Sequence, residues 1–85
     1  MTIETHETLH DIFPDDAPVL HALKVGNPHF RPLAGRFDEL GKEIYRIEVE
    51  IEPASDERLE ALKKERLAIL DEIAALVAEH RTGAA

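Results

Sequence analysis

The chain has 85 residues, a formal net charge of −8 and no cysteine. One domain is expected at this length, and the lack of cysteine excludes disulfides, thiolate metal sites and cysteine nucleophiles. Charged residues make up 33% of the chain and aromatic residues 5%, which is typical of long surface helices or coiled coils. The negative charge disfavours nucleic acid and anionic membrane surfaces as partners.

The start of the chain contains no basic or apolar signal region. No apolar run approaches the roughly 18 residues that a membrane-spanning helix requires. We therefore expect a cytoplasmic protein without a membrane partner.

Residues 1–27 are predicted to form an acidic leader with one or two short helices. A helical turn over about residues 4–12 would end at Pro14, because the residue before a proline is displaced from the α region. Asp15 and Asp16 are candidate caps for a second short helix. Both pieces are too short to be stable alone and are expected to dock or remain mobile. The apolar residues of the second helix are Val19, Leu20 and Leu23.

Gly26-Asn27-Pro28 marks the boundary between the leader and a helical hairpin predicted over residues 28–81. Pro28 suits a first helical position, whereas Pro32 is tolerated only if the helix begins slightly later. The start of the first long helix is therefore left open by about three residues.

The strongest pattern in the chain is an apolar heptad repeat over residues 29–51. Every a and d position of this repeat is apolar, which predicts a long amphipathic helix whose apolar stripe lies in the core. The stripe consists of Phe30, Leu33, Phe37, Leu40, Ile44, Ile47 and Ile51.

A turn at residues 52–55 is predicted to reverse the chain. Pro53 would stop the first long helix, and Ser55 is a good N-cap for the second. The second long helix is expected from about Asp56 to His80, followed by a frayed tail at residues 82–85. The predicted fold is thus all-α: a long antiparallel helical hairpin, coiled-coil-like, with a short helical leader.

The second long helix carries two apolar stripes. One stripe is assigned to the core of the hairpin, with Leu67 near Leu40, Leu70 near Phe37, and Val77 further along. The other stripe is left partly uncovered and is predicted to be an interaction face. Its members are Leu59, Leu62, Arg66, Ile69, Ile73 and Leu76.

Three arrangements would cover the interaction face: the leader folding back, a second copy completing a four-helix bundle, or another protein. A second copy is preferred, because symmetric homo-oligomers are the common outcome. Arg66 interrupts the stripe. It is interpreted either as a charge that specifies pairing or, preferably, as a long side chain that reaches solvent.

The sequence contains no arrangement typical of catalysis, so an enzyme is not expected, and no cofactor or small-molecule substrate is apparent. The expected function is a small non-catalytic protein–protein interaction module, structural or regulatory, that self-associates through helix faces. An alternative is a small accessory subunit or adaptor of a larger hetero-complex. A less favoured alternative is metal binding by His6 and His10, whose spacing of four is nonspecific.

The segment Ile51-Glu-Pro-Ala-Ser-Asp-Glu57 and the run Leu-Lys-Lys-Glu-Arg-Leu at residues 62–67 resemble the YdcH-like family of small bacterial proteins. So do Leu23-Lys24, His29-Phe30 and the run Glu-Ile-Tyr-Arg-Ile-Glu at residues 43–48. The resemblance covers roughly residues 12–78. It implies a helical hairpin in a bacterial cytosolic protein. The family is a domain of unknown function, so the resemblance implies no catalytic or binding residues.

Overall fold

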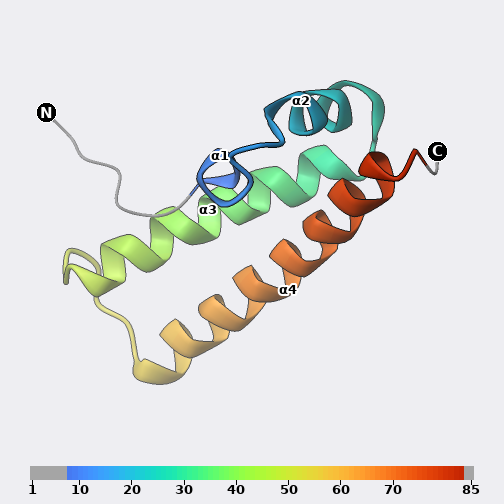
Figure 1. Ribbon diagram of the computed structural model, residues 1–85. Helices are drawn as coiled ribbons and strands as arrows, with labels where there is room; N and C mark the ends of the chain where they lie inside the picture. Colours follow the sequence, from blue (N-terminus) through green and yellow to red (C-terminus); the bar gives the residue numbers. More distant parts are fainter. Residues whose placement is uncertain (1–7, 84–85) are drawn as a thin grey trace, which may run out of the picture.

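The structure is a computed structural model that describes residues 8–83, and all regular elements within that range are helices (Figure 1). Two are short, α1 (Leu9–Ile12) and α2 (Ala17–Gly26), and two are long, α3 (Phe30–Glu48) and α4 (Asp56–Arg81). The molecule measures 44 × 30 × 18 Å along its principal axes. The predicted all-α class is confirmed.

Helices α3 and α4 pack against each other as the predicted antiparallel hairpin (Figure 1). Helix α4 begins at the predicted residue, because the Ser55 hydroxyl oxygen accepts a hydrogen bond of 3.1 Å from the Arg58 backbone N–H. This satisfies one of the donors that a helix start leaves unpaired. Asp56 and Glu57 lie in the first turn, where the helix dipole favours negative charge.

The start of α3 is settled by Asn27. Its side-chain oxygen accepts a hydrogen bond of 2.8 Å from the His29 backbone N–H, and the helix begins at Phe30. Pro32 therefore falls in the first turn, where its missing N–H has no intrahelical partner to lose.

The turn between the long helices is longer than predicted, because α3 ends at Glu48 and not at Ile51. Glu50 adopts a left-handed backbone with φ 63°. This conformation allows the N–H groups of Ile51 and Glu52 to donate to the Arg46 carbonyl, at 3.0 and 3.2 Å. The assignment of Ile51 to the core is wrong: its side chain is 70% exposed beyond the helix end.

The leader folds back onto the open end of the hairpin, where α2 contacts both long helices (Figure 1). Leu20 and Leu23 of α2 are buried in the common core. Helix α1 is closed by a capping box in which Thr8 and Asp11 exchange hydrogen bonds, and it ends before Pro14 as predicted. The part of the predicted first helix that precedes residue 8 lies outside the described residues.

The core runs along the interior of the hairpin and continues beneath α2. The α3 stripe is confirmed, apart from Ile51 and from Leu33, which is half-buried. The assignment of the α4 stripes is wrong at Leu67, which is 60% exposed, and at Ile73, which is fully buried, whereas the assignment of Val77 to the core is confirmed. The buried side chains are Leu20, Leu23, Phe30, Phe37, Leu40, Ile44, Ile47, Leu62, Ile69, Ile73 and Val77.

Helix α4 is rotated about its axis relative to the orientation predicted from the sequence. This difference can be seen at the Phe37 ring. The sequence pairing placed Leu70 opposite this ring, but the guanidinium of Arg66, one turn earlier on α4, lies 4.4 Å from the ring centroid. Leu70 is half-buried at the edge of the core. Because the loop of residues 49–55 is longer than the predicted four-residue turn, the register between the two helices differs from a tight hairpin.

Candidate interaction surfaces

The predicted interaction face does not exist as a free surface. Leu62, Ile69 and Ile73 are buried against α3, and Leu59 and Leu76 are half-buried at its margins.

Arg66, the charged member of that face, is also half-buried, and its guanidinium stacks on a ring of its own chain. A cation over an aromatic face gains electrostatic attraction. Arg66 therefore contributes to packing within the hairpin, so the preferred interpretation of a side chain reaching solvent is incomplete.

An open groove between α3 and α4 takes the place of the predicted face. We call it the α3–α4 groove. It has a cavity volume of about 570 Å³, and neither α1 nor α2 contributes to its lining. The lining combines apolar side chains with a few charged ones at the margin. Its residues are His29, Pro32, Leu33, Arg36, Ile69, Glu72, Ala75 and Leu76.

A bidentate ion pair crosses from α3 to α4 beside this groove. Arg36 Nε donates to Glu65 Oε2 at 2.8 Å, and Arg36 Nη2 donates to Glu65 Oε1 at 3.0 Å. The hydrogen bond to Glu65 raises the pKa of Arg36, and the hydrogen bond from Arg36 lowers the pKa of the Glu65 carboxyl. A second bridge nearer the turn joins Arg58 to Glu43. These pairs join the two helices along one side of the hairpin.

Four large apolar side chains are exposed in the described part of the chain: Val25, Val49, Ile51 and Leu67. Leu67 lies on α4, whereas Val49 and Ile51 lie in the loop that follows α3. Isolated exposed apolar residues are normal on protein surfaces. The α3–α4 groove is therefore the stronger candidate, because its apolar side chains come from two helices and line one concavity.

The histidine pair proposed for a metal is only partly described. His10 is an exposed residue of α1, and His6 lies outside the described residues. Within residues 8–83 no group of three or more histidine, cysteine, aspartate or glutamate side chains is arranged to hold a metal ion. In the same range, no helix combines the length and apolarity that crossing a membrane requires.

The fold and its surfaces define a small helical-hairpin protein with a folded-back leader. The family model described as "Protein of unknown function (DUF465)" matches residues 30–77, which span α3, the turn and most of α4. The chain belongs to this family, which includes the YdcH-like small bacterial proteins, and the resemblance seen in the sequence is thereby confirmed. Neither a curated protein nor a solved structure matches the chain.

Proposed function

We propose that this protein is a non-catalytic protein–protein interaction module of the bacterial cytoplasm that self-associates through the α3–α4 groove. The observation that supports this proposal is the groove itself, which α1 and α2 leave uncovered. Burying the half-exposed apolar side chains of the groove would stabilise an assembly by about 25 cal/mol for each Å² of apolar area removed from water.

A second copy is a suitable occupant because a symmetric dimer brings the same patch against itself. The apolar side chains of one groove, among them Leu33, Ala75 and Leu76, would then cover those of the other. Arg36 at the margin is already paired with Glu65 of its own chain, so the dimer would leave no unpaired arginine at this margin.

Ala75 provides the test, because it is exposed and lines the groove. Ala75→Lys would place a long charged side chain in the proposed interface. Ala61→Lys is the matched control: it makes the same change at an exposed position on the same helix, outside the groove lining. We expect light scattering after size exclusion to show a concentration-dependent dimer for the natural chain and Ala61→Lys, and a monomer for Ala75→Lys.

A strict monomer at all concentrations for the natural chain would overturn self-association. The accessory-subunit alternative would then apply, since the groove would need a different protein to cover it. Purification of the tagged chain from its source, followed by mass spectrometry, would test that alternative through a stoichiometric partner that Ala75→Lys loses and Ala61→Lys retains.

A further inference from the structure

A second concavity, separate from the α3–α4 groove, lies where α1, α2 and α3 meet. We call it the leader groove. Its cavity volume is about 440 Å³, within the range of small-molecule sites, and α4 contributes nothing to its lining. The inner wall includes Leu20, Phe30 and Phe37, whose side chains belong to the core. The groove thus offers an apolar wall that only a folded-back leader creates.

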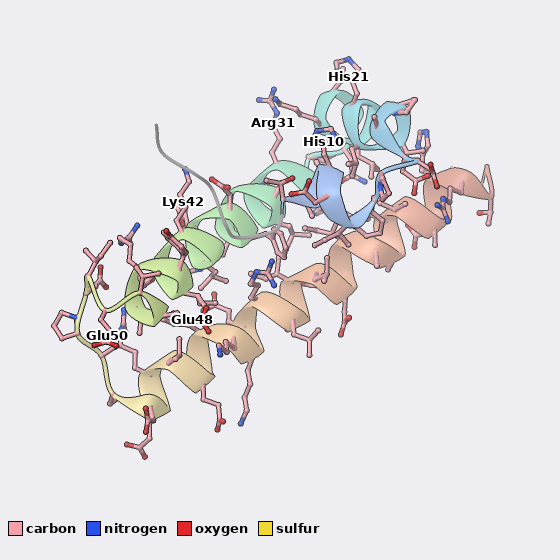
Figure 2. The ribbon with its side chains drawn as sticks, turned by 60° about the vertical axis from the view of Figure 1, so that its left-hand side comes forward. His10, His21, Arg31, Lys42, Glu48 and Glu50 are labelled. Carbon is pink, nitrogen blue, oxygen red and sulfur yellow. The ribbon has the colours of Figure 1, made fainter. Side chains whose placement is uncertain are left out.

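The rim of the leader groove is basic, in contrast to the rest of this acidic chain. Lys24 and Arg31 supply two fixed positive charges, and His10 and His21 are two further nitrogen-bearing side chains. All four side chains are exposed. Figure 2 shows His10, His21 and Arg31 gathered at the end of the molecule that carries α2, with Lys42 further along α3.

The acidic residue in the lining does not cancel this charge. Asp38 Oδ2 lies 3.1 Å from Lys42 Nζ, so part of its negative charge is offset from outside the groove, and Lys24 and Arg31 outnumber it in the lining. Arg31 Nε donates to the Lys24 carbonyl at 3.1 Å, which holds the guanidinium beside the end of α2. The two Nη groups of Arg31 form no hydrogen bond within residues 8–83, which leaves them available to an anionic group.

We propose that the leader groove binds a small organic anion with a flat apolar body and a single anionic head group, such as a carboxylate, sulfonate or phosphate. The apolar body would lie against Leu9 and Ala34, the half-buried apolar side chains of the lining, and the head group would lie between Lys24 and Arg31. A polyanion is a poorer fit, because the net charge of −8 would repel the charges that extend beyond the rim.

Two dyes with the same aromatic rings test this proposal. 8-Anilinonaphthalene-1-sulfonate carries the anionic group, and N-phenyl-1-naphthylamine lacks it. We expect fluorescence titration to give about tenfold tighter binding of the sulfonate, as one charge-assisted contact supplies. Equal affinities for the two dyes would overturn the proposed role of the basic rim.

Substitutions that remove single positive charges test whether the sulfonate dye binds in the leader groove. Lys24→Gln and Arg31→Gln should each weaken the sulfonate about threefold, since the two charges share the tenfold advantage of the sulfonate, and should leave the neutral dye unchanged. Lys64→Gln removes an exposed charge from α4, outside the groove, and should change neither dye. Circular dichroism would verify that each variant stays helical. Lys24→Gln is the safer of the two, because its side chain forms no hydrogen bond or ion pair within residues 8–83.

A steric variant separates this groove from other apolar surfaces. A Cβ at Gly35 would meet no atom within 4 Å, so Gly35→Leu adds a bulky side chain to the lining of the groove without a clash at its Cβ. Both dyes should then lose binding. Sulfonate binding that survives Gly35→Leu, or that falls as much in Lys64→Gln as in Lys24→Gln, would show that the dye binds elsewhere and would refute the proposed site.

Discussion

Asp16 and Arg81 join the two ends of the folded chain across 65 positions of sequence. Arg81 Nε donates to Asp16 Oδ1 at 2.9 Å, and a second guanidinium nitrogen donates to Oδ2. Asp16 is 7% exposed, and its hydrogen bond raises the pKa of Arg81. The predicted capping role of Asp16 is therefore only positional: it occupies the N-cap of α2, but its carboxylate forms no cap hydrogen bond and binds α4 instead.

Loss of this ion pair should loosen α2 from α4. Asp16→Asn and Arg81→Gln are each expected to lower the midpoint of thermal unfolding by several degrees, and the double variant should lose little more than either single one. Asp71→Asn, an exposed position on α4, is the control. Additive losses in the double variant would contradict a direct interaction between the two side chains.

The buried face of α4 is tested by two leucines on the same helix. Leu62 is 6% exposed and Leu67 is 60% exposed. Leu62→Ala should lower the free energy of unfolding by about 2–5 kcal/mol, whereas Leu67→Ala should change it by about 0.5 kcal/mol or less. Urea denaturation of dilute protein measures both. A larger loss of stability for Leu67→Ala than for Leu62→Ala would contradict the structure and support the sequence prediction that Leu67 lies in the core.

The left-handed residue that follows α3 should favour glycine. Glu50 has φ 63°, which costs a residue with a Cβ roughly 1 kcal/mol relative to glycine. Glu50→Gly is therefore expected to raise the free energy of unfolding by about 0.5–1 kcal/mol. Glu60→Gly, in the exposed interior of α4, should lower it by about 1 kcal/mol. A loss of stability in both variants would contradict the turn geometry.

The Arg36–Glu65 pair should make stability depend on acid pH. Since Arg36 lowers the pKa of Glu65 below its ordinary value of 4.5, the folded state binds the Glu65 proton more weakly than the unfolded state does. The pair's contribution is thus complete above that ordinary value and is lost as pH falls through the lower folded pKa. Arg36→Gln should reduce this acid dependence, as measured by urea midpoints across the acid range. An unchanged dependence would show that the pair does not contribute.

The sequence predicted those parts of the fold that depend on local chemistry. The heptad stripe from Phe30 to Ile47 and the cap at Ser55 follow from side-chain periodicity and from a hydroxyl next to unpaired N–H groups. Together with the stop at Pro53 and the helical spacing of apolar residues after Ser55, these features predicted two long antiparallel helices.

The rotation of α4 could not be predicted in the same way. The stripes containing Leu62 and Leu67 both have helical spacing, so only the partner helix decides which one is buried. That choice depends on the left-handed Glu50, on the position of Arg66 over Phe37, and on the bidentate bridge at Arg36. None of these three features can be predicted from the spacing of apolar residues along the chain. The two grooves were missed for a related reason, since their walls come from two or three helices.

The seven-residue loop that joins α3 to α4 also has a kinetic consequence. Contacts between the helices nearest the loop are local in sequence, and local contacts form fast because little chain entropy is lost in closing them, so the hairpin can grow from the loop outward. Docking of α2 must bring residues near opposite ends of the chain together, as at Asp16 and Arg81. The hairpin would therefore form first, as the folding nucleus, and α2 of the leader would dock on it in a later step.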